Sequence, residues 1–544
     1  MMRVIGRLLG GIGLATALVC AATAAQAGKR HGFWKPEFKL EFLGRHEGGG
    51  VGAAEIAAYD KRTKRLFVTN AAENKLVIID ISKPAAPKEV KSIDLSPYGG
   101  GPNSAAVSQG RVAVAVEASP KTDPGSVVFF DTNGKFKGKV QVGALPDMLT
   151  FTPDGKYLLV ANEGEPNSYN QPDSVDPEGT ISIISTSGHK VTQRDVRTAD
   201  FKRFNGKEAA LRARGIRIYG PNASAAQDFE PEYIAVDEDS RTAWVTLQEN
   251  NALAIVDIRH AYVREVVPLG YKNHMLAGKG LDASDRDDAI NIRNWPVLGM
   301  YQPDAIAHFK VKGRSYLITA NEGDARDWPG FAEEERVKDL PLDPAAFPDP
   351  AITEDENLGR LTVTSVNGDT DGDGDYDKLY VLGGRSFSIW DARGRLVHDS
   401  GDKLEKITAA ALPNEFNANN DEDNSFDSRS DNKGPEPEGV AVGEVLGRTL
   451  AFVGLERIGG VATFDVSNPY APKFQHYINT RVFDDEDDVA GDSGPEGVLF
   501  ISRGDSPTRD PLVVVTNEIS GTVAIYAVRW RGGHGHGHGH HAKR

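Results

Sequence analysis

Short runs of β-branched and aromatic residues recur along the chain, and each run ends near Gly, Asn, Asp or Pro. In one pair of runs, five residues separate Leu66–Asn70 from Leu76–Asp80. The same arrangement is seen in Ala243–Leu247 with Leu253–Asp257, and in Leu450–Leu455 with Val461–Asp465. Runs of this length and composition predict β-strands, and helical periodicity is almost absent from them.

A shorter predicted strand precedes each pair, and most of these strands begin with proline and an acidic residue. These entries are Pro146-Asp147, Pro231-Glu232, Pro303-Asp304, Pro437-Glu438 and Pro495-Glu496. Four strands in a repeated unit of roughly forty residues are typical of a β-propeller. We count seven such units, and the unassigned strands within residues 360–401 leave room for an eighth blade.

The two ends of the repeat predict how the ring closes. The last unit ends after its third strand, at Val528, and an extra strand, Lys39–Gly44, precedes the first full unit. We expect Lys39–Gly44 to complete the last blade, which would leave no open sheet edge. The predicted fold class is therefore all-β, with residues 28–530 forming one propeller domain.

Residues 1–27 have the organisation of a secretory signal peptide. Arg3 and Arg7 form the positive region, an apolar run follows, and Ala25-Gln26-Ala27 is a small-x-small cleavage site. The apolar run is too short to be a good membrane span, so no transmembrane anchor is expected. The single cysteine, Cys20, would be removed with this segment, which excludes disulfides and cysteine chemistry. We expect a secreted or periplasmic protein.

The formal net charge is −16, which disfavours nucleic acid and anionic membranes as partners. The same charge favours solubility and cation binding. We also expect the protein to be a monomer. Residues 531–544 form a Gly- and His-rich tail that cannot bury a core. Imidazole suits zinc, copper and nickel, so the tail is either a metal-binding segment or a tail without such a role. Its histidines are His534, His536, His538, His540 and His541.

Carboxylates recur at two positions of the repeat, the entry to the first strand and the end of the second strand. In a propeller these positions lie on the same face, around the mouth of the central channel. The entry positions hold Glu55, Asn103, Asp147, Glu232, Asp304, Glu438 and Glu496. The second-strand ends hold Ala71, Glu117, Glu163, Gln248, Glu322, Glu456 and Glu518.

Two sets of like charges around one channel require protonation, basic partners or bound cations. Oxygen-rich sites favour Ca²⁺, Mg²⁺ or Mn²⁺. The alternative is that these acids accept hydrogen bonds from turn amides and pair with nearby arginines.

The segment Asp369–Asp377 is the sharpest calcium signal. It matches the front half of an EF-hand loop, including the glycine of the sharp turn at Gly374. Its candidate ligands are Asp369, Asp371, Asp373, Asp375 and Asp377. The twelfth position is Tyr380 instead of a bidentate Glu, and the flanks are predicted strands. We expect a calcium loop outside an EF-hand fold, the alternative being a solvated acidic hairpin.

Two arginines stand beside candidate metal-binding acids. Arg326 follows Glu322 at the start of a long insertion, and Arg457 follows Glu456. Such a pairing suits a bound phosphate or sulfate, although an arginine often only pairs with its neighbouring acid.

Four segments resemble the choice-of-anchor I family: Asn321–Arg326, Gly383–Asp391, Gly434–Val440 and Gly454–Gly460. The resemblance covers nearly the whole mature chain. It implies an exported, propeller-like protein, held by varying anchors or by none. The family includes proteins similar to an atypical cyanobacterial alkaline phosphatase and to a cell-surface glycoprotein of biomineralising animals. The resemblance thus implies links to calcium and phosphate, but it carries over no catalytic residue.

Two function classes follow. In the first, the protein is a calcium-dependent, alkaline-phosphatase-like phosphoesterase that acts on a phosphate ester. Cations would then be held by Glu322, Glu438, Glu456 and Glu496, and phosphoryl oxygens would be clamped by Arg326 and Arg457. In the second, it is a non-catalytic, calcium-loaded protein that binds a matrix or mineral surface. Fold alone cannot distinguish them, because propellers host both.

Overall fold

The computed structural model describes residues 38–483 and 490–531. The predicted signal peptide, residues 1–27, and the tail histidines lie outside the described residues. Within the described part, strands predominate and the helices are short, so the expectation of an all-β protein is confirmed.

The first four sheets follow the chain in order, each strand pairing antiparallel with the next. The first sheet comprises β2 (Ala57–Asp60), β3 (Arg65–Asn70), β4 (Lys75–Asp80) and β5 (Lys88–Asp94). The second comprises β6 (Pro102–Ser108), β7 (Arg111–Val116), β8 (Pro124–Asp131) and β9 (Phe136–Ala144). The third comprises β10 (Pro146–Phe151), β11 (Tyr157–Asn162), β12 (Thr180–Ser185) and β13 (Val196–Asp200). The fourth comprises β14 (Pro231–Val236), β15 (Thr242–Leu247), β16 (Ala252–Asp257) and β17 (Tyr262–Pro268).

The last three sheets contain the interruptions. The fifth comprises β20 (Ile306–Val311), β21 (Arg314–Asn321), β27 (Ser386–Asp391) and β28 (Leu396–Asp399). The sixth comprises β29 (Pro437–Val445), β30 (Arg448–Leu455), β31 (Val461–Asp465) and β32 (Lys473–Ile478). The seventh comprises β33 (Pro495–Ile501), β34 (Leu512–Asn517), β35 (Thr522–Trp530) and the N-terminal β1 (Phe38–Glu47). The described residues form no eighth four-stranded sheet, because residues 360–401 contribute two strands to the fifth sheet.

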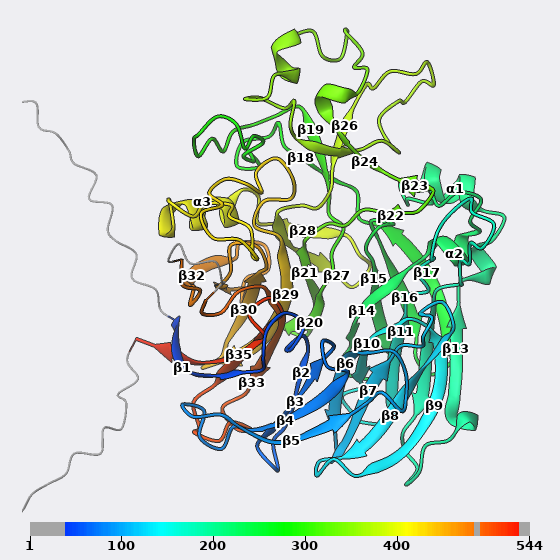
Figure 1. Ribbon diagram of the computed structural model, residues 1–544, viewed down its shortest axis with the longest axis vertical. Helices are drawn as coiled ribbons and strands as arrows, with labels where there is room; N and C mark the ends of the chain where they lie inside the picture. Colours follow the sequence, from blue (N-terminus) through cyan, green and yellow to red (C-terminus); the bar gives the residue numbers. More distant parts are fainter. Residues whose placement is uncertain (1–37, 484–489, 532–544) are drawn as a thin grey trace, which may run out of the picture. The chain divides into compact units, whose positions relative to one another are not determined.

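The first strands of the sheets surround a common centre (Figure 1). Each contacts the first strand of the next sheet along the chain, from β2 through β6, β10, β14, β20 and β29 to β33. Strand β33 in turn contacts β2. Middle strands such as β3 and β7 are buried on both faces because each sheet lies between two others. This burial explains the continuous apolar runs of the sequence. The chain is a β-propeller.

Strand β1 pairs antiparallel with β35, from Phe38 opposite Trp530 to Glu47 opposite Thr522, with a register shift between Phe42 and Gly44. Its inward residues Phe38 and Leu40 are buried with side chains of the sixth and seventh sheets. A strand from one end of the chain thus completes the sheet formed by the other end.

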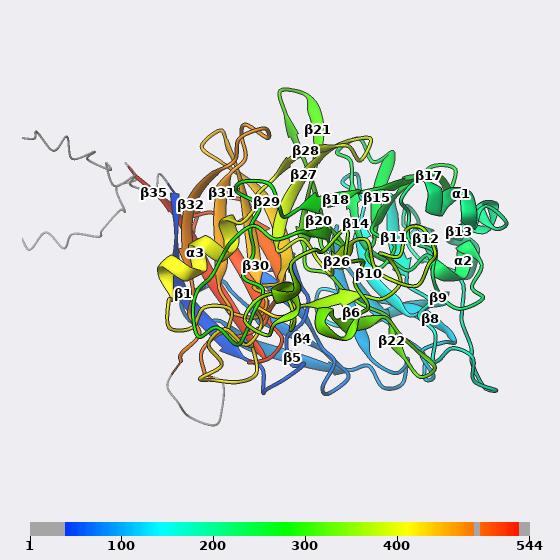
Figure 2. The ribbon, with the colours of Figure 1, turned by 90° about the horizontal axis from the view of Figure 1, so that it is seen from above.

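The repeat is interrupted at residues 271–300, 322–385 and 400–436, and we call these three segments the insertion region (Figures 1 and 2). The first two share a buried apolar cluster. The third is joined to them by ion pairs of Arg360 and Arg385, and it buries Leu404 against the fifth and sixth sheets. Its strands are β18 (Tyr271–Asn273), β19 (Val297–Met300), β22 (Asp327–Trp328), β23 (Phe331–Ala332), β24 (Glu334–Arg336), β25 (Thr362–Thr364) and β26 (Leu379–Val381). Its helices are η3 (Val337–Asp339), η4 (Pro350–Thr353) and α3 (Lys403–Ala411). A parallel pairing of β19 with β26 joins the first two segments.

A shorter helical connection leads into the fourth sheet. It contains η2 (Lys202–Phe204), α1 (Glu208–Ala213) and α2 (Ala225–Asp228), whereas η1 (Gln193–Asp195) lies earlier, between β12 and β13 of the third sheet. Phe201, Phe204 and Phe229 of this connection are buried in the core between the third and fourth sheets. The packing holds Asp228 and Glu230 beside the entry of β14.

Candidate metal centre

The strand entries owe their shape to proline. In β10, β14, β29 and β33 the pairing register shifts immediately after the first proline. Because proline has no amide hydrogen to donate, the ladder is interrupted there and the next residue is not paired with the second strand. In each of these strands that next residue is Asp or Glu.

The entry side chains line a hollow of about 180 Å³ at the ring centre. Its polar walls are Glu55, Asn103, Asp147, Asp304 and Glu496, from five different sheets. Tyr233 lies at its edge, next to the entry residue Glu232. The structure therefore brings entry residues, far apart in the sequence, to one place.

Three carboxylates converge beside this hollow: Glu322, Glu438 and Glu456, which we call the mouth trio. Each offers an oxygen within 4.8 Å of the other two. Glu438 belongs to the predicted entry set, whereas Glu322 and Glu456 belong to the second-strand set. Gly323, at φ +94°, turns the chain sharply after Glu322, and a Cβ there would lie 2.2 Å from the backbone nitrogen of Gly383. The turn therefore requires glycine.

Polar neighbours orient two members of the trio. Glu322 accepts hydrogen bonds from Lys433 Nζ at 2.7 Å and Gln248 Nε2 at 2.9 Å. Glu456 accepts one from Asn420 Nδ2 at 2.8 Å. Glu438 shares a hydrogen bond with the Glu496 carboxyl group instead of a basic partner.

The channel acids are poorly compensated, and their pKa values reflect this. Burial, and then the charges of Glu496 and Glu322, raise the pKa of Glu438 well above its ordinary value. Burial and the charge of Glu436 raise the pKa of Glu456 to about 7. Burial and neighbouring acids likewise raise the pKa of Asp147 to about 7 and that of Glu55 to about 8. Without a cation, several of these carboxyls must hold protons near neutral pH.

Basic residues near the trio are mostly engaged by Glu436, which is fully buried. It pairs with Lys433 Nζ at 2.9 Å and Arg457 Nε at 3.1 Å, and also with Arg429. Burial alone would raise the pKa of Glu436, but the positive charges of Lys433, Arg429 and Arg457 hold this pKa at about 2. Arg457 also lies 3.3 Å from Glu456 and keeps a partly exposed side chain.

Arg326 does not fit the role of an exposed phosphate clamp. Its side chain is 1 % exposed, and it bonds Asp228 Oδ2 at 3.0 Å and Glu230 Oε2 at 2.8 Å. Its guanidinium also lies over the Tyr219 ring. The two acids use the donors that a phosphoryl group would need, so Arg326 has a structural role here.

Sequence reasoning did not select several acids of this region, although a repeated signal was present. Asn162-Glu163-Gly164-Glu165 matches Asn321-Glu322-Gly323-Asp324, and Glu230-Pro231-Glu232 matches Glu436-Pro437-Glu438. In the second match the acid two residues before the predicted one, Glu230 or Glu436, is buried, whereas in the first match Glu165 is half-buried and Asp324 is exposed. Glu249, next to Gln248, is buried as well, and no motif marks it.

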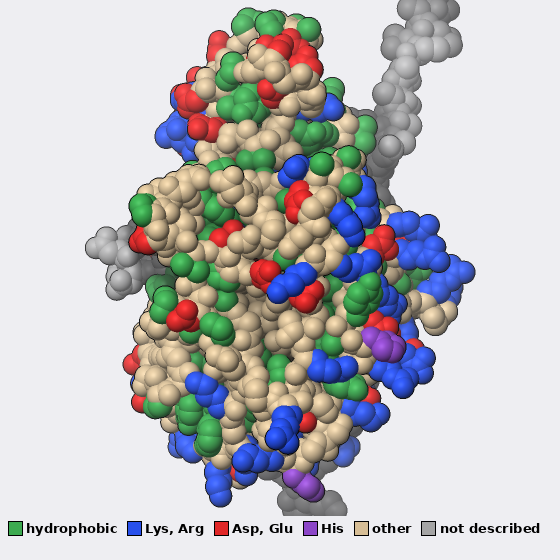
Figure 3. Space-filling view, turned by 90° about the vertical axis from the view of Figure 1, so that its right-hand side faces the viewer, with side chains coloured by type: hydrophobic (Ala, Val, Ile, Leu, Met, Phe, Trp, Pro, Cys, Tyr) green, Lys and Arg blue, Asp and Glu red, His purple; other side chains and the backbone are tan. Residues whose placement is uncertain are grey.

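The acidic segment Asp369–Asp377 lies on the insertion region, where acidic side chains gather on the surface (Figure 3). Asp369, Asp371 and Asp373 are exposed, and their oxygens come within 4.8 Å of one another. Asp377 instead accepts a hydrogen bond from Thr370 N at 2.8 Å. Tyr380 is buried against Tyr271 and cannot occupy a ligand position.

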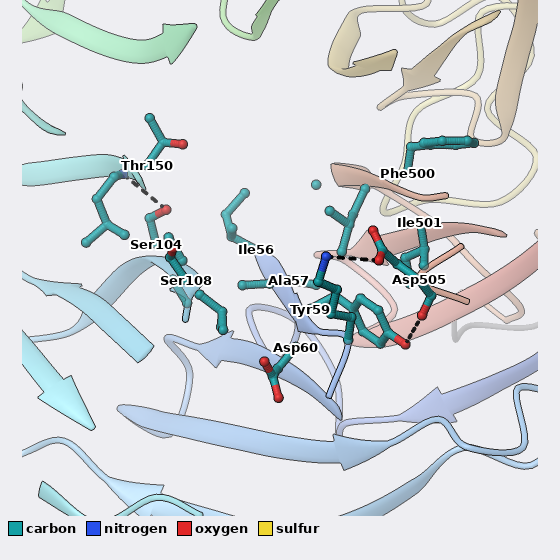
Figure 4. A pocket seen from close by; sticks show the side chains of 18 of the residues that line it. Ile56, Ala57, Tyr59, Asp60, Ser104, Ser108, Thr150, Phe500, Ile501 and Asp505 are labelled. Carbon is teal, nitrogen blue, oxygen red and sulfur yellow. Dashed lines mark hydrogen bonds and ion pairs between the residues drawn. The ribbon is translucent and has the colours of Figure 1, made fainter. Parts of the chain in front are cut away.

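A second, larger hollow of about 920 Å³ lies further along the same first strands, away from their entries (Figure 4). Its walls are both polar and apolar, with Asp60, Lys61, Arg62 and Asp505 among the lining residues. Tyr59 there donates a hydrogen bond to the Asp505 carbonyl at 2.9 Å. Tyr233 is one of the residues that line both hollows. Four acids line the smaller hollow, whereas the larger one is lined by two, Asp60 and Asp505.

The raised pKa values predict an unusual pH dependence. Between about pH 5 and 8 the folded protein binds more protons than the unfolded chain, whose Glu pKa is about 4.3. Stability of the calcium-free protein should therefore fall as pH rises through this window. Each unit of raised pKa corresponds to about 1.4 kcal/mol for a fully titrated group.

Thermal unfolding measured with EDTA at several pH values checks this expectation, and a parallel series with calcium serves as the control. Calcium should stabilise the folded protein most at the upper end of this pH window, where protons no longer compete with it for the channel carboxylates. A calcium-free melting temperature that rises from pH 5 to 8 would contradict the prediction.

Among the described residues, no helix has both the length and the apolar character needed to cross a membrane.

Comparison with known proteins identifies relatives of this chain. The sequence model of the choice-of-anchor I domain matches residues 55–469. The mesenchyme-specific cell surface glycoprotein of Strongylocentrotus purpuratus is 29 % identical over 400 residues, which cover 64 % of this chain and 47 % of that protein. Gigasin-3a of Magallana gigas is 33 % identical over 196 residues, covering 33 % of this chain and 68 % of that protein. The chain thus spans about half the length of the sea-urchin glycoprotein.

Solved structures with a similar arrangement have little sequence in common with this chain. Hydrazine synthase of Kuenenia stuttgartiensis aligns with a TM-score of 0.44 at 13 % identity, over 90 % of this chain and 99 % of that one. The Cps50 (Swd1) β-propeller domain of Myceliophteria thermophila aligns with a TM-score of 0.43 at 8 % identity, over 90 % and 100 %.

Proposed function

The chain belongs to the choice-of-anchor I family, and from this premise we propose that it is an extracytoplasmic propeller that binds a divalent cation, calcium in the first place, at the channel mouth. The observation that carries the proposal is the mouth trio, with Glu322, Glu438 and Glu456 within 4.8 Å of one another. Like charges at this separation are held most favourably around a cation.

The donor set fits a hard cation. The trio and the adjoining Glu496 offer only carboxylate oxygens as ligands, and so do the other channel acids described above. Calcium, magnesium and manganese prefer such ligands, whereas zinc and copper favour nitrogen and sulfur. Glu438 and Glu496 lack a basic partner, so a cation would replace the proton that they otherwise share.

The proposed location outside the cytoplasm rests on the N-terminal sequence and on the relatives. Residues 1–27 have signal-peptide organisation, and one matched relative is described as a cell surface glycoprotein. Millimolar calcium is common outside cells, where sites with dissociation constants of about 10⁻⁴ to 10⁻³ M are occupied.

A titration of the full chain with calcium, followed by thermal unfolding, tests the proposal. Calcium should raise the melting temperature because it binds the folded state and not the unfolded chain. Asp371→Ala combined with Asp373→Ala should remove a minor part of the rise, since that segment is exposed. The same rise in both proteins would show that the Asp369–Asp377 segment does not contribute to it, and no rise in the parent would refute calcium binding.

A second candidate function, metal-dependent phosphoester hydrolysis, is favoured by one further observation. Arg457 and Lys433 place positive charge beside the trio, and Arg457 is partly exposed. A divalent cation at the trio would supply polarisation of a phosphoryl oxygen and activation of water. Arg457 would orient an anionic substrate by a charge-assisted hydrogen bond. If no phosphomonoester or diester is hydrolysed with calcium, magnesium or manganese, the non-catalytic matrix- or mineral-binding function remains.

A further inference from the structure

A second group of buried acids lies in the insertion region, away from the channel residues described above. It consists of Asp282, Glu405 of α3, and Asn417 and Asp427 of the loop that follows α3, and we call it the insertion cluster. These side chains are 0 to 3 % exposed. Asp427 lies in an acid-rich stretch of the sequence, residues 421–431, and the other three belong to no motif that the sequence singled out.

Hydrogen bonds link the four residues into one continuous group. Asn417 Nδ2 donates to Glu405 Oε1 at 3.2 Å and to Ser430 Oγ at 2.8 Å. The Ser430 hydroxyl donates to Asp427 Oδ1 at 2.5 Å. The backbone nitrogen of Asp282 lies 3.4 Å from Glu405 Oε1. Two segments of the insertion region, residues 271–300 and 400–436, therefore meet here.

Each member of the cluster retains a buried oxygen without a hydrogen-bond partner. These atoms are Asp282 Oδ1, Glu405 Oε2, Asn417 Oδ1 and Asp427 Oδ2. A buried polar atom without a partner costs about 1 to 3 kcal/mol, so four such atoms in one place favour a bound ligand. All four atoms are oxygens, which can coordinate a cation or accept a hydrogen bond. None of the four is a nitrogen or sulfur ligand.

The charge of the cluster is also unbalanced. Arg385, 1 % exposed, pairs with Glu405 at 2.8 Å and bonds the Asp282 carbonyl. Lys272 lies 3.9 Å from Asp399, and Asp285 and Asp431 are paired with Arg360. Three carboxylates thus face one guanidinium, leaving a formal charge of about −2, which one divalent cation would neutralise.

We propose that the insertion cluster binds a divalent cation of the calcium type, which fastens the loop after α3 to the rest of the insertion region. Carboxylate and amide oxygens together are usual calcium ligands, and calcium accepts irregular arrangements that magnesium does not. The cluster carboxylates are not among the described groups of three within 4.8 Å. Bound cation would therefore draw them closer and include the Asn417 oxygen and water. This site is independent of the channel function.

The metal content of the full chain tests the proposal. After dialysis at low free calcium, the parent protein is compared by elemental mass spectrometry with Asp282→Asn/Asp427→Asn. The control is Asp288→Asn/Asp421→Asn, which makes the same charge change at exposed positions of the same two segments. The first variant should bind one calcium fewer per chain than the control. Equal calcium content in the two variants would overturn the proposal.

A measurement on the parent protein keeps the test decisive if the buried variant does not fold. Amide hydrogen exchange within residues 413–432 should slow when calcium is added to EDTA-treated protein, because the cation closes local opening of that loop. Unchanged exchange there would refute the site. Glu438→Gln protein, in which Glu456 keeps its hydrogen bond with Asn420 of the same loop, should keep this protection, which separates the insertion cluster from the channel.

Discussion

Deletion of β1, residues 38–47, is expected to destabilise the protein more than any other change considered. The deletion removes Phe38 and Leu40 from a buried cluster that includes Phe452 of the sixth sheet and Tyr526 of the seventh. Burying each of these two side chains contributes about 1.5 to 3 kcal/mol to stability. Without β1, strand β35 also loses its hydrogen-bonded partner and becomes an exposed sheet edge. We expect a loss of about 5 kcal/mol or more, which is a large fraction of the stability of an ordinary domain.

Chemical denaturation of the deleted and parent chains measures this effect. A milder variant tests the same contact without shortening the chain: a Cβ at Gly44 would lie 2.9 Å from the Ala85 carbonyl, so Gly44→Leu should also destabilise. Lys39→Ala, at an exposed position of β1, is the matched control. If the deleted protein unfolded at the same denaturant concentration as the parent, β1 would not be needed to hold the seventh sheet.

Glu438→Gln combined with Glu456→Gln is expected to have opposite effects on stability and on calcium binding. Each substitution replaces a poorly compensated buried acid with a neutral side chain of the same size. The calcium-free protein should therefore become more stable near pH 8, where the acids of the parent ionise against one another. Calcium affinity at the channel should fall by at least about 100-fold, equivalent to about 2.7 kcal/mol, because two ligands are lost.

Calorimetric titration and thermal unfolding measure the two effects, and Glu444→Gln is the control because Glu444 is exposed on the same strand as Glu438. Hydrolysis of a phosphomonoester, if the parent shows it, should be lost in the double variant and kept in the control. A double variant that binds calcium as the parent does would place the cation elsewhere. Retained hydrolysis would separate the reaction from the mouth trio.

Much of the fold follows from local pattern, and so does part of the site. The repeated pairs of apolar runs are buried strands, and in five repeats a proline at the strand entry is followed directly by an acid. Because strand entries of a propeller converge, the position of Glu438 or Asp147 within its repeat was enough to place its side chain at the channel. The pairing of Glu322 and Glu456 with Glu438 followed from the same repeat geometry.

Partner choice among charged residues could not be predicted in this way. Arg326 was expected to clamp phosphoryl oxygens beside Glu322, yet it bonds Glu230, 96 residues earlier in the chain. Adjacency in sequence was misleading there, because the connection before β14 brings Asp228 and Glu230 against the start of the insertion. The insertion cluster shows the same limit, since Asp282, Glu405 and Asp427 come from segments that share no repeat and no motif.

The sequence by itself determined the strands, the propeller class and the placement of acids at strand entries, because these depend on short-range pattern and on a repeat that the ring superimposes. Only the tertiary structure decided which acids have a basic partner and which are left with like-charged neighbours. That outcome depends on burial and on distances of a few ångströms between segments far apart in the chain, where a small displacement decides between an ion pair and an uncompensated charge.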